Sequence, residues 1–354
     1  MAVVRGHRPD LDGIRAIGML QVMAYHFETG PLFKGAAINV DLFFALSGYL
    51  ITGLLIAERA DTGRVDLPAF YLRRAFRLLP ALLVLLSFGG IAIAVALPGD
   101  RNHALIVGGL ISLFYVTDLV SYSHDTLWAT YVWTWTLSLE EQFYLLWPTI
   151  MRKGALTRER GRQLVFGAVV LSLILAEVTA KGAGPHANAP IDYYQPQAHV
   201  FSIMVGCAAA LVTVPRWFRH LALPALAGLI ALGQFSPLHM SANYLRFNVP
   251  AAAVLTVIVM LALEHSPRTA GVILGNRPIA HLGAISYGLY LYHPVVYIVL
   301  AQEVHRAHWL IVTLSFLVTW VIAEISYKFW ESPVRRHGRA WLARRKSARE
   351  AMAT

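Results

Sequence analysis

The first hydrophobic stretch of the sequence, residues 11–30, contains two side chains that are costly in a lipid environment. Arg15 lies near its beginning and His26 near its end, eleven positions apart. In an α-helix, eleven positions make close to three full turns, so both side chains would project from one face, about 16 Å apart. Because a charged side chain at the centre of a membrane helix costs roughly 2.5–3.5 kcal/mol, we interpret the pair as functional. A hydrogen-bonded packing role is the alternative for His26.

Three carboxylates follow in other apolar stretches. Asp41 opens the stretch VDLFFALSGYLIT and is expected at about the depth of His26, where it could orient the imidazole ring and raise its basicity. The alternative is an acidic residue at a helix start that faces water. Glu140 and Glu141 are adjacent inside TWTLSLEEQFYLLWP, and since they lie about 100° apart on a helix, at most one can face lipid. We predict an acid/base cluster of His26, Asp41, Glu140 and Glu141 toward the outer side. His293, in the outer half of the later stretch ISYGLYLYHPVV, is a further candidate member of this cluster.

Arginines cluster at the start of the third apolar stretch, in FYLRRAFRLLP. Arg74 and Arg77 are three positions apart and share a helix face, with Arg73 beside them. Basic residues on the cytoplasmic side of a membrane protein are common. Arginine also binds phosphate oxygens in a bidentate manner. Together with Arg15, these residues predict a cationic mouth that could bind the pyrophosphate or 3′-phosphate of a nucleotide.

The composition defines the class of protein that must position these residues. The chain is 57% hydrophobic and 14% charged, whereas a soluble domain carries about 25% charged residues. Several apolar stretches approach the roughly 20 residues that span a bilayer. The net charge of +10 is therefore interpreted as contact with membrane lipids, and no nucleic-acid partner is expected. Cys207 is the only cysteine and the fourteen histidines show no ligand spacing, so no metal site is expected.

Charge placement predicts the topology. If all eleven apolar segments crossed the membrane, the basic connectors 58–77 and 152–162 would lie on opposite sides. If segment 103–123 does not cross, the basic connectors share one side, as positive-inside topology requires. We predict an all-α integral membrane protein with about ten transmembrane helices, both termini cytoplasmic, and 103–123 re-entrant or interfacial. Residues 1–336 would form one multi-pass domain in the cytoplasmic membrane, and 337–354 a basic cytoplasmic tail on anionic headgroups.

Six stretches of the chain together resemble the integral-membrane acyltransferase 3 (OafA-like) family. They occur in the family order and span positions 10 to 336, so that the combined signal is specific although each stretch alone is weak. The matching stretches are LDGIRAIGMLQVMAYH, VDLFFALSGYLIT, FYLRRAFRLLP, TWTLSLEEQFYLLWP, SYGLYLYHPV and FWESP.

The resemblance implies an acyltransferase for groups other than aminoacyl groups. Acyl-CoA would be the co-substrate, usually acetyl-CoA, and the acceptor a hydroxyl of a carbohydrate, glycolipid or glycosylated small molecule. Carried over by position, His26 is the catalytic residue, Arg15 its companion, Arg74 and Arg77 the cytoplasmic arginine pair, and Glu141 the glutamate of EQFY.

These expectations combine into a hypothesis for the site. Arg15 and the arginines at 73, 74 and 77 would hold the phosphates of acyl-CoA. His26 would act as general base or as transient acyl carrier, oriented by Asp41 or Glu141.

Two other functional classes remain open from the residues. A proton-coupled transporter or lipid flippase also uses intramembrane histidines and carboxylates. A non-catalytic scaffold would use the same polar residues only to join helices. Among enzymes, another membrane O-acyltransferase family with an intramembrane histidine is the alternative.

Overall fold

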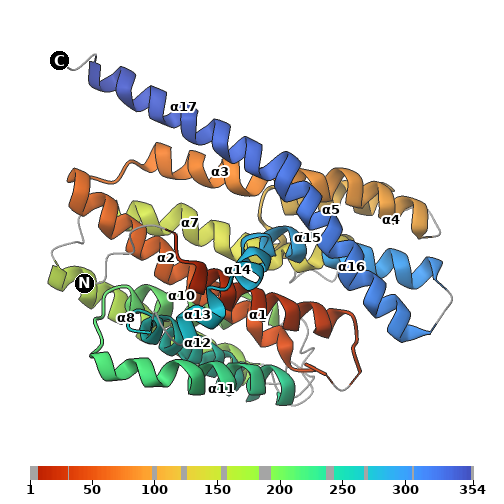
Figure 1. Ribbon diagram of the computed structural model, residues 1–354, viewed down its shortest axis with the longest axis horizontal. Helices are drawn as coiled ribbons and strands as arrows, with labels where there is room; N and C mark the ends of the chain where they lie inside the picture. The colour runs from red at the N-terminus through yellow and green to blue at the C-terminus, as the bar shows by residue number, and fades with distance from the viewer. Residues whose placement is uncertain are drawn as a thin grey trace.

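A computed structural model describes residues 7–30, 32–97, 102–120, 126–152, 158–182, 193–236, 243–266, 270–304 and 307–351. Within these ranges the chain is helical and contains no β-strand, which confirms the predicted all-α class. Most of the long helices run in broadly the same direction along the molecule (Figure 1).

The helices fall into a group of long ones and a group of short ones. The long helices are α1 (Pro9–His26), α2 (Asn39–Thr62), α3 (Leu67–Val84), α7 (Trp135–Arg152), α8 (Arg158–Gly182), α10 (Pro196–Ala209), α11 (Ala222–Phe235), α12 (Val249–Leu263), α15 (Ser286–Glu303), α16 (His308–Ser326) and α17 (Ser332–Ala351). The short helices are α4 (Gly90–Ala96), α5 (Asn102–Leu113), α6 (Thr117–Val120), α13 (Ala270–Leu274) and α14 (Arg277–Ala284).

Six segments of the described chain are long and apolar enough to cross a membrane, or seven if the bent pair α14–α15 counts as one span. The six are Ala36–Thr62, Leu67–Ala96, Gly161–Thr179, Arg216–Phe235, Tyr244–Leu263 and His308–Arg345. The protein is therefore multi-pass, while the count of ten spans and the side of the termini stay predictions. Two helices counted among the ten, α1 and α7, carry several charged residues each, and this polarity keeps them outside the six.

Segment 103–123 does not form one membrane-crossing helix. Its main helix, α5, has 12 residues and is therefore about 18 Å long, against about 30 Å for the hydrocarbon core of a bilayer. The helix packs against η3 (Thr126–Thr134). This length agrees with the prediction that the segment is re-entrant or interfacial.

Glycines allow a close contact between two core helices, α2 and α10. A Cβ atom on Gly48 would collide with the backbone carbonyl of Ile203, and one on Gly206 with the backbone carbonyl of Ala45. Small residues at such positions let two membrane helices approach at backbone distance. This contact places the polar side chains of α2 directly against α10.

The C-terminal helix α17 is packed on the protein. It continues α16 through the short π-helix η6 (Tyr327–Glu331) and lies alongside α3 (Figure 1). Trp330 Nε1 donates to the backbone carbonyl of Pro80 at 3.1 Å. A Cβ atom on Gly338 would collide with the ring of Phe76. The predicted boundary at 336/337 therefore lies inside a helix that contacts the rest of the fold.

Candidate active site

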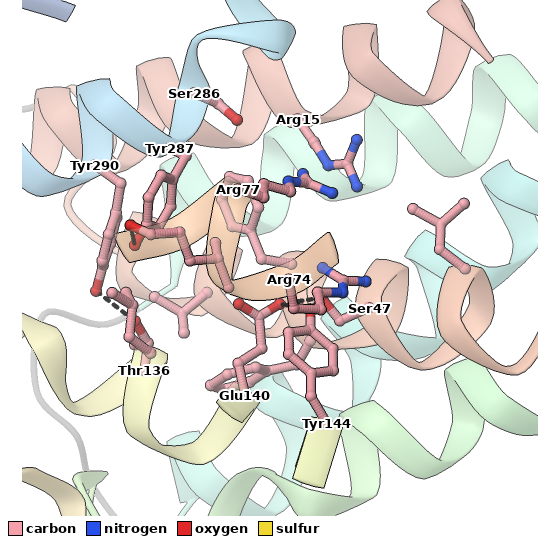
Figure 2. A pocket seen from close by; sticks show the side chains of 16 residues that line it. Arg15, Ser47, Arg74, Arg77, Thr136, Glu140, Tyr144, Ser286, Tyr287 and Tyr290 are labelled. Carbon is pink, nitrogen blue, oxygen red and sulfur yellow. Dashed lines mark hydrogen bonds between the residues drawn. The ribbon is translucent and has the colours of Figure 1, made fainter. Parts of the chain in front are cut away.

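Five helices, α1, α2, α3, α7 and α15, enclose a cavity of about 90 Å³, here called the inner cavity. Each of these helices carries one of the stretches that the sequence analysis singled out. Figure 2 shows its labelled side chains, which come from all of these helices. Four predicted site residues line it together: Arg15, Arg74, Arg77 and Glu140.

Glu140 is held in the inner cavity by hydroxyl groups. Its Oε1 atom accepts a hydrogen bond from Tyr144 at 2.8 Å and another from Ser47 of α2. The guanidinium of Arg74 lies over the Tyr144 ring, 4.1 Å from the ring centre, in a cation–π arrangement. Glu140 and Tyr144 are four positions apart and share one face of α7, so this pairing is visible in the sequence once the helix is assumed.

Glu140 therefore lies with the arginines. We had expected it at the depth of His26, and that prediction was wrong. The reason is where α7 begins. Its first residue is Trp135, and Glu140 lies about 7.5 Å further along the helix axis. Trp135 packs 4.8 Å from the His199 ring, at the level of Asp41.

A second, larger cavity of about 410 Å³ adjoins the inner one; we call it the arginine cavity. Arg15, Arg77, Ser286 and Tyr287 line both cavities. Arg73 lines only the arginine cavity, and its guanidinium is 3.4 Å from Glu58. The predicted arginines thus lie close together, with Arg74 in the inner cavity and Arg73 in the arginine cavity.

His26, at the end of α1, forms a hydrogen bond with His293 of α15. Its Nδ1 atom lies 2.8 Å from His293 Nε2, and His293 Nδ1 lies 3.0 Å from the backbone carbonyl of Leu289. A carbonyl only accepts, so His293 Nδ1 carries a proton, and the Nε2 atom of the neutral ring accepts from His26 Nδ1–H. The neutral His26 ring is left with an unprotonated Nε2 atom, which is the form that a general base requires.

His293 bonds the backbone of its own helix, close to a proline. His293 precedes Pro294 inside α15, and proline cannot donate a backbone hydrogen bond within the helix. The carbonyl that loses its N–H partner in this way is that of Tyr290, four positions before the proline, whereas the buried His293 ring bonds the Leu289 carbonyl. The place of His293 in SYGLYLYHPV predicts a position toward the outer side, as for His26, but no pattern in the sequence indicates the bond between the two rings.

Tyr290 and Thr136 separate the inner cavity from the two histidines. Both line the cavity, and the Thr136 hydroxyl donates to the Tyr290 hydroxyl at 2.8 Å. The Tyr290 ring centre is 5.8 Å from that of His293. In Figure 2, Thr136 and Tyr290 lie at the end of the cavity away from Arg15 and Arg74. The inner cavity therefore has arginines at one end and Tyr290 at the other, and the histidine pair lies next to Tyr290.

Asp41 bonds His199 of α10. We had expected Asp41 to orient His26, but the residue that bonds His26 is His293. His199 Nδ1 lies 2.9 Å from Asp41 Oδ1, and Ser202 donates to the same oxygen at 2.6 Å. His199 Nε2 lies 2.7 Å from the backbone carbonyl of Tyr193, so that nitrogen carries a proton. Both side chains of the pair are fully buried.

Glu141 lines neither cavity. Its Oε1 atom is buried and has no hydrogen-bond partner among the described residues. A role for Glu141 in orienting His26 therefore stays a prediction.

Comparison with known proteins was made against sequence families and individual proteins. The profile of the acyltransferase domain family, which corresponds to the acyltransferase 3 family named above, matches residues 8–327. This chain belongs to that family. It is 30% identical to a candidate peptidoglycan O-acetyltransferase of Bacillus subtilis (strain 168), over 95% of this chain and 56% of that protein. It is 28% identical to the peptidoglycan O-acetyltransferase OatA of Listeria monocytogenes serovar 1/2a, over 94% of this chain and 57% of that protein.

The chain thus spans little more than half the length of these curated relatives. No solved structure matches it.

We predict that Asp41 stabilises the fold through His199. Asp41→Ala should lower the free energy of unfolding by about 3 kcal/mol, because it breaks a buried pair and leaves one partner behind. Asp41→Asn should lose about 1 kcal/mol, since its amide can donate to a neutral His199 Nδ1 atom. Thermal unfolding of the detergent-purified variants measures both. An Asp41→Ala protein that unfolds at the temperature of the wild type would contradict this role.

Proposed function

We propose that this protein is a membrane-embedded O-acetyltransferase. It would transfer an acetyl group from acetyl-CoA, which enters from the cytoplasmic side, to a hydroxyl of a carbohydrate-containing acceptor. The observation that carries the proposal is the hydrogen bond of His26 Nδ1 to His293, which leaves Nε2 of the neutral His26 ring as an acceptor at the other end of α1 from Arg15. The relatives named as peptidoglycan O-acetyltransferases support both the acetyl group and the carbohydrate acceptor.

The shapes of the two cavities suit the two ends of acetyl-CoA. The arginine cavity of about 410 Å³ falls in the range of small-molecule sites, 300–1,000 Å³, and can receive a phosphate-bearing nucleotide. The inner cavity of about 90 Å³ suits a narrow chain such as the pantetheine arm. Arg15 and His26 are about 16 Å apart along α1, a length that the extended arm can cover.

The chemistry assigned to His26 is general-base catalysis. Its Nε2 atom takes the proton of the acceptor hydroxyl while the hydroxyl oxygen attacks the thioester carbonyl carbon. The carbon–sulfur bond then breaks, and the proton passes from His26 to the departing CoA sulfur. General-base assistance of this kind contributes roughly 10²–10⁴-fold to a rate. A route in which Nε2 first carries the acetyl group would use the same atom.

In this scheme the Tyr290 side chain must move to admit the donor, whereas the His293 side chain keeps its position. Tyr290 and Thr136 close the inner cavity before the histidine pair, so the thioester reaches His26 when the Tyr290 side chain turns aside. His293 stays in place, and its Nε2 atom accepts from the positively charged His26 ring during the reaction. No observation in this structure or among the relatives favours the transporter or flippase alternative.

The direct test of the proposed function removes the base. His26→Ala should lower turnover of radiolabelled acetyl-CoA by at least about 100-fold, because no other group takes the hydroxyl proton, and CoA binding should persist. His337→Ala is the matched control, since His337 is exposed on α17 and bonds the backbone carbonyl of Pro333. Full turnover in the His26→Ala protein would overturn the assignment.

His293 provides a second test, which separates orientation from packing. His293→Leu removes the acceptor for His26 Nδ1–H and should lower kcat by about tenfold or more, with little change in KM for acetyl-CoA. His293→Gln places an amide oxygen near the former Nε2 position and should recover a large part of kcat. Steady-state kinetics and ¹⁵N NMR of the His26 tautomer measure the effect. Equal losses of kcat in both variants would indicate packing alone.

A further inference from the structure

The C-terminal helix forms one wall of the arginine cavity. Arg335, Arg339 and Leu342 line the cavity from α17, opposite the residues of α3 and α1. They are spaced by four and three positions and therefore share one face of the helix. Two contacts hold that face toward α3: the bond from Trp330 to the Pro80 carbonyl, and the approach of Gly338 to Phe76.

The neighbouring basic residues of α17 point elsewhere. Arg336 lines a separate groove with His281, Glu324 and Lys328. Arg345 lies over the Trp341 ring, 5.3 Å from its centre. The positive charge of α17 is thus divided among several faces, and among the side chains that the structure describes on this helix, the arginines that line the cavity are Arg335 and Arg339.

Positive charge in the arginine cavity exceeds negative charge. Five arginines line it, 15, 73, 77, 335 and 339, against the carboxylates of Asp12 and Glu331. Arg15 is paired with Asp12 at 2.8 Å, and Arg73 with Glu58 at 3.4 Å. Within the described ranges, no ion pair joins Arg77, Arg335 or Arg339 to a carboxylate.

The Arg335 guanidinium instead lies 4.8 Å from the centre of the Tyr327 ring. Like charges that face one another across a cavity repel, and a multiply charged anion between them removes this repulsion. Arginine pairs in particular suit the oxygens of a phosphate group.

We infer that Arg335 and Arg339 bind the 3′-phosphate of the CoA nucleotide. The inference rests on the proposed function and adds α17 to the donor site. In CoA, the pyrophosphate follows directly after the pantetheine arm, and the 3′-phosphate lies beyond it on the ribose. With the arm in the inner cavity, the pyrophosphate lies near Arg15 and Arg77, which line both cavities. The 3′-phosphate then lies further from the inner cavity, toward α17.

This assignment concerns a part of the chain that the family profile does not cover. The profile match ends at residue 327, before α17 begins at Ser332. The sequence analysis placed the basic tail on lipid headgroups, whose phosphates have the same chemistry as the 3′-phosphate. The experiment must therefore distinguish a CoA phosphate from a lipid phosphate.

The test compares CoA with 3′-dephospho-CoA on the full-length protein in non-ionic detergent. The wild type should bind CoA at least about tenfold more tightly than dephospho-CoA, measured by isothermal titration calorimetry. The double variant Arg335→Gln/Arg339→Gln should lose this preference, with CoA affinity falling to the level of dephospho-CoA. The control Arg336→Gln/Arg344→Gln removes the same charge from other faces of α17 and should bind CoA like the wild type.

Three outcomes would overturn the inference. In the first, the Arg335→Gln/Arg339→Gln protein binds CoA as tightly as the wild type and still prefers it to dephospho-CoA. This result would exclude both arginines from the 3′-phosphate site while leaving the proposed function intact. If the same protein were instead retained less on phosphatidylglycerol vesicles, the two arginines would belong to lipid headgroups. Absence of CoA binding in every form, the wild type included, would contradict the donor itself and with it the proposed function.

Discussion

A polar side chain buried in an apolar helix bundle is costly unless it finds a partner, and this constraint accounts for the main contacts between the helices of the site, with Glu141 as an exception among the described residues. An unpaired buried polar group costs several kcal/mol in such surroundings. The chain meets the constraint with bonds between helices: Glu140 of α7 to Ser47 of α2, Asp41 of α2 to His199 of α10, and His26 of α1 to a histidine of α15. Each bond fixes the register of two helices, and the same bonds build the candidate active site.

The first helix connects the two functions of the site. One end of α1 contributes Arg15 to both cavities, and the other end contributes His26 to the histidine pair. α1 is held by close backbone contacts, since a Cβ atom on Gly13 would collide with the backbone of Leu274 and one on Gly283 with that of Asp12. Held in this way, α1 sets the separation between the proposed phosphate site and the nitrogen proposed to act as the base.

The sequence was sufficient to predict the helical class, the family and the group of arginines, because these depend on composition and on local spacing. Arg15, Arg74, Arg77 and Glu140 could be proposed from helical periodicity and do share a cavity. Partners across helices could not be predicted. His199 lies 158 positions from Asp41 and His293 lies 267 positions from His26, and no local pattern indicates such contacts.

The depth of Glu140 and the place of the C-terminal helix were also beyond the sequence. The first depends on the residue at which α7 begins. The second depends on packing against α3, through the Trp330 bond to Pro80 and the close approach of Gly338 to Phe76, which makes part of a basic tail a wall of the arginine cavity. In both cases tertiary packing determines the position of the residues, which local composition does not specify.

The central claim is that the donor enters on the side of the arginine cavity and reacts at the far end of α1. Sealed vesicles with the purified protein test this claim when radiolabelled acetyl-CoA is supplied on one side at a time. The thiol introduced by Ser347→Cys on the exposed part of α17, in a Cys207→Ser background, reports the orientation through a membrane-impermeant maleimide. We expect acetyl turnover only when acetyl-CoA is on the side where this thiol reacts. Turnover supported equally or better from the opposite side would contradict the account.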